Sequence, residues 1–414
     1  MASIVYQRII NRRQSGRFPM PFESQIPVYG LRRCQLACAV CLASCILLLC
    51  CWANPLAAAP IPAPPQLSAN SFLLFDHDSG KVLASKDPDK RIEPASLTKM
   101  MTAYIVASAL QRGNVTLDEP VLVSAEAQAM PGSRMFIEAG SVVPLQDLLR
   151  GLIIQSGNDA SVALAEHIAA TEPVFVDMMN RMAKSLGMTS TNFTNASGLP
   201  GDNHYTTASD LAIIASAIIR EHPETYKLYS EREFTFNDIT QKNRNSLLWR
   251  DESVDGMKTG HTQAAGYCLV ASAVRENMRL VSIVLGSASE SIRIAESQKL
   301  LNYGFRFFRT RQVYAAGEAV AQARLWMGET EQIELGVADN LYLTLPRDDF
   351  ASLQSKIELN SYIRAPVIVG RELGRSVLMA GDRVVREVPL LALQTAEEGG
   401  IFTRMKHSIQ RFFQ

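Results

Sequence analysis

The order in which strand and helix patterns follow one another constrains this 414-residue chain most. An apolar hairpin pattern at 72–83, with a turn from Asp76 to Gly80, comes first. Apolar spacings of three and four then predict helices at 96–112, 145–155, 160–169, 174–186 and 209–220. Strand patterns return at 267–274 and 279–285, and a helix is expected at 291–308. This order predicts an α+β domain whose first and last strands share one sheet.

A different pattern begins beyond Arg311. Alternating segments at 341–345, 367–373, 377–380 and 384–388 predict a small all-β domain over 312–395. The tail, 396–414, repeats apolar residues at helical spacing opposite Arg404, Lys406 and Arg411, so it predicts a basic amphipathic helix. We expect this helix to lie on the inner-membrane surface, because it is terminal, follows Gly399-Gly400 and carries cations. The alternative is a helix that packs its apolar side on the β-rich domain.

The first 59 residues have the three regions of a secretory signal: arginines ending at Arg33, an apolar run at 34–52, and small residues ending at Ala59. We therefore expect export to the periplasmic side of a bacterial cytoplasmic membrane, with cleavage after Ala59. An uncleaved anchor, initiation at Met20 and lipid attachment at Cys45 remain alternatives. Residues 60–66 are a proline-rich linker, so the first folded domain is expected at 67–311.

Charge and cysteine content exclude several classes. The leader has six arginines and one glutamate (+5), whereas the remaining 35 basic and 40 acidic side chains give −5. A chain without a basic excess is not expected to bind nucleic acid. Six of the seven cysteines lie in the leader, so Cys268 has no internal disulfide partner and is expected to be a core thiol. The sequence implies no metal and no cofactor.

The first chemical motif is Pro94-Ala95-Ser96-Leu97-Thr98-Lys99, which opens a predicted helix. A spacing of three places the side chains of Ser96 and Lys99 on the same side of the first turn. A serine hydroxyl needs a base to become a good nucleophile, and an amine serves when burial and a neighbouring cation lower its pKa. The alternative is a capping serine followed by a solvated lysine.

Two further motifs follow in the chain. Ser156-Gly157-Asn158 lies between two helical segments, where Gly157 is expected to let the chain turn and present both polar side chains to a cleft. Lys258-Thr259-Gly260-His261 precedes the strand at 267–274, and Gly260 is expected to let a ligand approach the backbone. For the motif that begins at Lys258, the alternative is a polar turn before the strand.

Together the three motifs follow an order associated with penicillin-binding proteins and class A β-lactamases. The chain resembles the low-molecular-mass D-alanyl-D-alanine carboxypeptidases of the type-5 penicillin-binding protein group over essentially all of its exported part. The resemblance rests on PASLTKMMTAY, QSGNDASVALAE, VDGMKTGHT, AGYCLVASA and ESQKLLNYGFRFF. It implies a DD-peptidase/β-lactamase-like fold, with a helix cluster on an antiparallel sheet, followed by the β-rich domain and the tail.

The resemblance also implies roles for individual residues. Ser96 would be the acylated nucleophile, Lys99 its base and Ser156 a proton relay, while Asn158 would help to orient the peptide. The carboxylate of the substrate would be held by Lys258 and Thr259 with support from Arg293, and Gly260 would let the substrate approach the backbone. The backbone N–H groups of Ser96 and His261 would form the oxyanion hole. For Arg293 the alternative is a surface charge on a helix. Lys258 is also expected to help keep Lys99 neutral.

The reaction implied by the resemblance is removal of the terminal D-alanine from a peptidoglycan stem pentapeptide. The expected partners are this substrate and β-lactam inhibitors, which would acylate Ser96. A DD-endopeptidase, a β-lactamase of the same fold and a non-catalytic wall-binding scaffold remain alternatives. A Ser-His-Asp hydrolase is disfavoured, because the sequence contains no Gly-x-Ser-x-Gly motif.

Overall fold

The computed structural model describes residues 61–412, and the predicted leader lies outside them. The first domain is built on a five-stranded antiparallel sheet of order β2-β1-β9-β8-β7. Its strands are β1 (Ser71–Asp76), β2 (Val82–Lys86), β7 (Val254–Thr262), β8 (Gly266–Arg275) and β9 (Met278–Ser287). The predicted sharing of one sheet by the first and last strands is therefore confirmed, since Leu73 of β1 pairs with Ile283 of β9.

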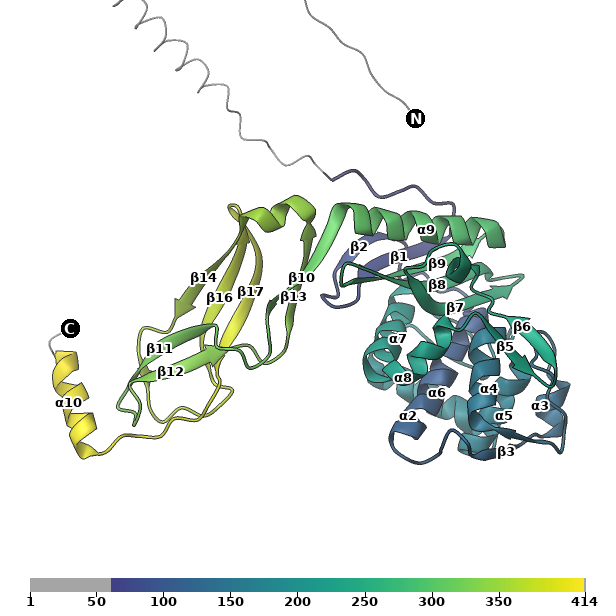
Figure 1. Cartoon of the computed structure of the whole chain (residues 1–414), viewed down its shortest axis with the longest axis horizontal. Coiled ribbons are helices and arrows are strands. Elements are labelled where there is room, and N and C mark those ends of the chain that lie inside the picture. The colour runs from purple at the N-terminus through teal and green to yellow at the C-terminus, as the bar shows by residue number, and fades with distance from the viewer. Residues whose placement is uncertain (1–60, 413–414) are drawn as a thin grey trace, which may run out of the picture. The chain divides into compact units, whose positions relative to one another are not determined.

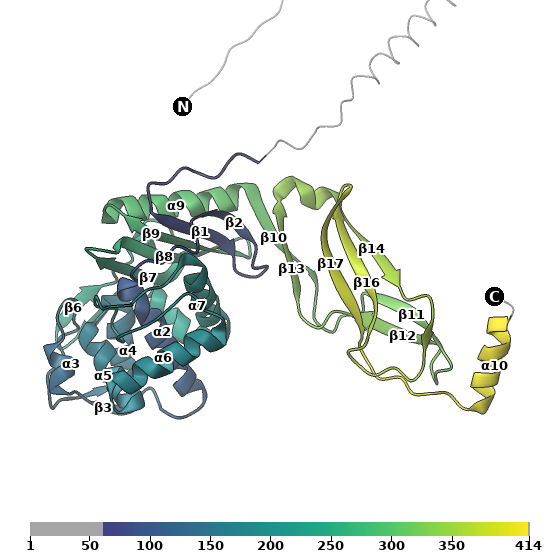
Figure 2. The same cartoon turned by 180° about the vertical axis from the view of Figure 1, so that it is seen from behind.

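Helices cover both faces of this sheet (Figures 1 and 2). Helix α9 (Glu290–Phe307) lies along one face, and the helical cluster lies on the other. The cluster comprises η1 (Ala95–Thr98), α2 (Lys99–Gln111), α3 (Ala125–Ala129), α4 (Leu145–Arg150), the π-helical turn η2 (Gly151–Gln155), α5 (Asn158–Ala169), α6 (Glu172–Leu186), α7 (Ala208–Glu221), α8 (Pro223–Tyr226) and η3 (Lys227–Ser230). Capping side chains explain where two of the helices begin: Thr207 caps the N-terminus of α7, and Ser289 caps that of α9.

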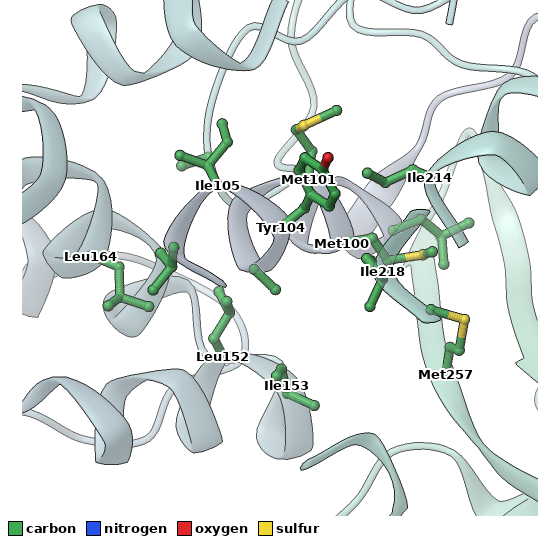
Figure 3. Packing of buried hydrophobic residues seen from close by; sticks show 14 of the residues in the cluster. Met100, Met101, Tyr104, Ile105, Leu152, Ile153, Leu164, Ile214, Ile218 and Met257 are labelled. Atoms are coloured by element: carbon green, nitrogen blue, oxygen red, sulfur yellow. The ribbon is translucent and has the colours of Figure 1, made fainter. Parts of the chain in front are cut away.

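Successive side chains along each strand point to opposite faces of the sheet, and this divides the core into two layers. On β1, Leu73 and Phe75 belong to the cluster that the helices cover, whereas Phe72 and Leu74 belong to the cluster beneath α9. Figure 3 shows the helical side, where side chains of α2 such as Met100 and Ile105 pack among Leu152 of η2, Leu164 of α5 and Ile218 of α7. Burial on both faces explains why β1 is a continuous apolar run.

Short elements complete the first domain. Two small hairpins, β3 (Pro120–Leu122) with β4 (Val142–Pro144) and β5 (Glu233–Phe236) with β6 (Ile239–Lys242), flank the helices, and η4 (Ser246–Trp249) precedes β7. The Lys-Thr-Gly motif lies within β7, so the turn interpretation of this segment is wrong. Cys268 is buried on β8, as expected for a core thiol.

The second domain is all-β, as predicted. A six-stranded sheet has the order β14-β16-β17-β12-β11-β15, and β10 pairs with β13. The elements are β10 (Phe308–Tyr314), β11 (Ala321–Trp326), β12 (Gln332–Gly336), β13 (Leu341–Pro346), η5 (Arg347–Ser352), β14 (Leu353–Leu359), β15 (Ile363–Arg364), β16 (Glu372–Ala380) and β17 (Arg383–Ala392). The strand predicted at 367–373 is wrong, because 367–371 form a loop in which Ile368 and Val369 are exposed.

The tail forms helix α10 (Ile401–Phe412), as predicted. It contacts the β-rich domain through polar groups: Nδ1 of the buried His407 accepts the Met327 N–H at 2.8 Å, and Arg324 donates to Gln410 Oε1 at 2.9 Å. Its apolar side chains face away from the domain, with Ile401 72% and Phe402 85% exposed. The alternative in which the apolar side packs on the β-rich domain is therefore wrong. Within residues 61–412, no helix combines the length and hydropathy needed to cross a bilayer.

Candidate active site

Ser96 and Lys99 meet where η1 passes into α2. The Lys99 Nζ lies 3.1 Å from the Ser96 Oγ. The lysine side chain is only 1% exposed, which is rare for lysine, and burial lowers its pKa from 10.5 to about 7. Asp159 opposes this shift through its negative charge. The amine therefore exists in its neutral, proton-accepting form over a large part of the physiological pH range.

Ser156 and Asn158 lie at the junction of η2 and α5. The positive φ of this turn belongs to Ser156 (66°) and not to Gly157, which corrects the sequence interpretation. A Cβ at Gly157 would stand 2.7 Å from Asp159 Oδ1, so glycine is required there by close packing. The Asn158 Oδ1 accepts a hydrogen bond from Lys99 Nζ at 2.6 Å. The motif thus reaches the base directly.

Lys258, Thr259, Gly260 and His261 lie on β7, the edge strand of the sheet. The Lys258 Nζ donates to Ser156 Oγ at 2.8 Å, which connects the second and third motifs. Burial, followed by the charges of Lys99, Arg244 and Arg293, holds the pKa of Lys258 well below its usual value. For Lys99 the main cause of the lowered pKa is burial, and a neighbouring cation is not needed to explain it.

A side chain at Gly260 would be in tight contact with another part of the chain. A Cβ on this residue would lie 3.2 Å from Ala95 Cβ, Leu97 Cγ and Pro94 O, the segment that carries the nucleophile. From the sequence we expected this glycine to let a ligand approach the backbone. The structure shows instead that η1 packs against β7 at this point. The small residue therefore sets the distance between the serine and the edge strand.

Arg293 is not a surface charge. It is 5% exposed on α9, and its guanidinium donates to the Gly260 carbonyl at 3.3 Å and pairs with Glu290 at 3.2 Å. Its Nε is buried without a hydrogen-bond partner among the described residues. The alternative stated for this residue is therefore wrong, because the side chain is buried and is held at β7 and α9.

A cavity of about 580 Å³ brings these elements together. Ser96, Ser156, Thr259, Gly260, His261 and Arg293 line it, whereas Lys99, Asn158 and Lys258 are buried behind its wall. The sequence analysis missed Lys242, Arg244 and Ser246, which also line the cavity. The signal that could have found them is the polar run 241–246, which contains two cations within three residues. Among the residues that line the cavity, only Glu290 is acidic. The cavity therefore suits an anionic ligand.

A fourth segment, residues 195–199, was also missed. The carbonyl of Ser197 accepts a hydrogen bond from Lys99 Nζ at 2.5 Å. Gly198, at φ +83°, lies so close to the nucleophile segment that a Cβ would stand 1.8 Å from the Ala95 carbonyl oxygen. The sequence offered only the turn-forming composition of this segment as a signal.

An amine that can accept the proton of a serine hydroxyl, opposite a strand edge that can pair with a peptide, is the arrangement of a serine hydrolase that works through an acyl-enzyme. The chain belongs to the D-alanyl-D-alanine carboxypeptidase family, whose model matches residues 58–289, more than half of its length. The model of the penicillin-binding protein 5 C-terminal domain matches residues 308–398. The resemblance inferred from the motifs, and the fold it implied, are confirmed.

Individual relatives agree with this assignment. The chain is 41% identical over 361 residues to the D-alanyl-D-alanine carboxypeptidase DacA of Escherichia coli, covering 85% of this chain and 90% of the relative. Penicillin-binding protein 5 of Haemophilus influenzae superposes with a TM-score of 0.78 and 41% identity, covering 81% of this chain and 100% of that one. Penicillin-binding protein D2 of Listeria monocytogenes, solved in its ampicillin-bound form, gives a TM-score of 0.54 and 31% identity, covering 58% and 100%.

The contact of Gly198 with Ala95 predicts that Gly198→Ala displaces the backbone that carries Ser96. We expect the rate of acylation by a fluorescent penicillin to fall at least about 10-fold, since small displacements of reacting groups are costly. Gly187→Ala is the matched control, because Gly187 also has a positive φ (+90°) but open space around its Cβ position. Equal acylation rates for the two variants would contradict the importance of this contact.

Proposed function

We propose that this protein is a serine-type D-Ala-D-Ala carboxypeptidase that removes the terminal D-alanine from peptidoglycan stem pentapeptides. The observation that carries the proposal is the hydrogen bond between Lys99 and Ser96, made by an amine whose pKa is lowered to about 7 by burial. The family and its relatives, which match over most of the chain, support the same activity.

In the proposed acylation step, Ser96 Oγ attacks the carbonyl carbon of the penultimate D-alanine while its proton passes to Lys99 Nζ. The C–N bond then breaks, and free D-alanine leaves after its amine has received a proton. Ser156, which is bonded to Lys258 and lines the cavity together with Ser96, would relay that proton. Water afterwards hydrolyses the ester on Ser96, which releases the shortened peptide and restores the serine.

Binding of the substrate is assigned to the cationic lining and to the strand edge. The terminal carboxylate would be held by Thr259 and the guanidinium of Arg293, which line the cavity, together with Lys258, which lies behind the wall and is bonded to Ser156. Gly260 keeps η1 close to β7, so that the N–H groups of Ser96 and His261 can stabilise the oxyanion. Such donors contribute ~3 to 4 kcal/mol each in serine hydrolases. Asn158 would help to orient the peptide beside the base.

β-Lactams are proposed as inhibitors that acylate the same serine. The similarity to a penicillin-binding protein solved with ampicillin supports this assignment. A β-lactamase would hydrolyse the drug rapidly, whereas a carboxypeptidase of this kind retains it. The match of the C-terminal domain to that of penicillin-binding protein 5 favours the carboxypeptidase.

We also propose that the protein is exported and rests on the membrane surface through α10. Support comes from the signal-like pattern of residues 1–59 and from the exposed side chains of Ile401, Phe402, Met405 and Ile409. A helix that contacts its own domain through His407 and Gln410 leaves its apolar residues free for a lipid surface.

The decisive test of the activity is D-alanine release from a pentapeptide that ends in D-Ala-D-Ala. We expect the wild type to release D-alanine and Ser96→Ala to release none, because the hydroxyl is the nucleophile. Ser108→Ala, which changes a buried serine of α2 that does not line the cavity, serves as the control. Release by Ser96→Ala would refute the nucleophile, and no release by the wild type would favour a scaffold. Preferential cleavage of cross-linked dimers would instead identify an endopeptidase.

Activity should depend on pH through Lys99. Only the neutral amine accepts the serine proton, so kcat/KM should rise as the pH increases through about 7, the pKa to which burial lowers this group. The measurement is the pH profile of kcat/KM for the pentapeptide between pH 5 and 10. A rate that stays constant down to pH 5 would contradict lysine as the base.

Membrane binding should depend on the exposed apolar side chains of α10. We expect Phe402→Ser combined with Met405→Ser to abolish co-sedimentation with vesicles that contain anionic lipid, because the helix loses apolar area. Ile368→Ser combined with Val369→Ser removes exposed apolar side chains of the β-rich domain and should have no effect. If both double variants bind like the wild type, α10 is not the anchor.

A further inference from the structure

The neutral amine of Lys99 can donate two hydrogen bonds through its N–H groups and accept one through its lone pair. Three oxygen atoms lie within hydrogen-bond distance: Asn158 Oδ1 at 2.6 Å, the Ser197 carbonyl at 2.5 Å and Ser96 Oγ at 3.1 Å. The first two are carbonyl oxygens and can only accept. When both N–H bonds are directed to them, the lone pair points to the third atom, Ser96 Oγ. The two carbonyls therefore determine whether the amine can act as a base toward this serine.

The Ser197 carbonyl is held in place by the side chain of Asn195. The Asn195 Oδ1 accepts the backbone N–H groups of Ser197, Gly198 and Leu199 at 3.2, 2.7 and 3.1 Å. Its Nδ2 donates to the Leu199 carbonyl at 2.8 Å. One side chain thus closes the whole turn from which the acceptor of the Lys99 N–H projects.

His204 connects the same turn to the beginning of the nucleophile helix. Its Nδ1 lies 3.1 Å from Thr194 Oγ1 and 3.3 Å from Asn195 Nδ2, and its Nε2 lies 3.0 Å from Thr98 Oγ1. Burial lowers the pKa of His204 to about 4, so the ring is neutral at physiological pH. The turn and the residue beside Lys99 are therefore joined by uncharged groups that do not change between pH 6 and 9.

We propose that Asn195 is a positioning residue for acylation: by fixing the Ser197 carbonyl, it directs the lone pair of Lys99 toward Ser96. The inference rests on the proposed function, since it assigns the orientation of the same base. Asn195 does not reach the substrate cavity, whose lining does not include it, and it acts through Lys99.

The charged groups that influence Lys99 come from other elements. Asp159 on α5 raises its pKa, and the charge of Lys99 in turn lowers the pKa of Lys258 on β7. Glu172 of α6 approaches the turn, where its Oε1 accepts the Ala196 N–H at 2.9 Å. Asn195 is neutral, so its removal changes no charge. Any change in the pH profile would then report altered solvation and geometry of the amine.

The test compares Asn195→Ala and Asn195→Ser with Asn192→Ala in the purified protein. Asn192 belongs to the same segment and also donates to a backbone carbonyl, that of Asn203 at 2.8 Å, but it has no contact with the Lys99 network. The measurements are the acylation rate constant with a fluorescent penicillin, the pH profile of kcat/KM with a pentapeptide, and the melting temperature.

We expect Asn195→Ala to acylate about 10- to 100-fold more slowly, the range for misplacement of a reacting group. The acidic limb of its pH profile should move above 7, because a loosened turn admits water to the amine and raises its pKa toward the ordinary value. Asn195→Ser should be intermediate, since a serine hydroxyl closes such turns more weakly. Asn192→Ala should match the wild type in rate and profile.

Two results would overturn the proposal. One is an unchanged acylation rate and acidic limb in Asn195→Ala. The other is a loss that follows the melting temperature alone and leaves the acidic limb of both Asn195 variants at the wild-type position, since that identifies a purely structural role. If Asn195→Ala does not fold, Asn195→Ser decides between the same outcomes. Failure of the proposed function would appear separately, as an inactive wild type.

Discussion

Burial of the Lys99 amine is the constraint on which the site depends. Lowering its pKa from 10.5 to about 7 corresponds to roughly 5 kcal/mol less stability for the charged form, and the fold must compensate for this. Compensation comes from the packing of α2, one of the most buried elements of the domain, among α5, α7 and η2 (Figure 3). A second lysine, Lys258, is also buried. Its hydrogen-bond partner, Ser156, lies 102 residues earlier in the chain. The helical cluster and the sheet therefore have to form together before Lys258 has its partner.

The cleft is a consequence of a sheet that is covered on both faces but open at one edge. Strand β7 ends the sheet, and η1 packs closely against it at Gly260, while Gly198 lets the 195–199 turn approach η1. This closeness sets the serine beside a strand edge suited to pairing with a peptide. Arg293 reaches the same place from α9 on the other face, where it is held by Gly260 and Glu290. Groups from both layers of the core thus meet at a single edge.

The C-terminal helix is held by polar contacts and not by burial of its apolar side chains. This helix, α10, contacts the β-rich domain by hydrogen bonds through His407 and Gln410, and its apolar residues are left exposed. Apolar side chains gathered on one side of a terminal helix are costly in water and favourable at a lipid interface. This arrangement is the basis for the proposed binding of α10 to a lipid surface.

The sequence by itself determined the element order, the all-β second domain, the tail helix and the three motifs, because periodicity and short spacings are local properties. Ser96 and Lys99 are three residues apart on one turn, so their contact was predictable from the chain. The strand at 367–373 and the surface placement of Arg293 were wrong, since pairing and burial depend on distant partners. Asn195 and Ser197 carry no local signal of function beyond the turn-forming composition of their segment. Only the tertiary structure could bring the Ser197 carbonyl to an amine 98 residues earlier in the chain, because hydrogen-bond geometry across the core is decided by packing and not by sequence spacing.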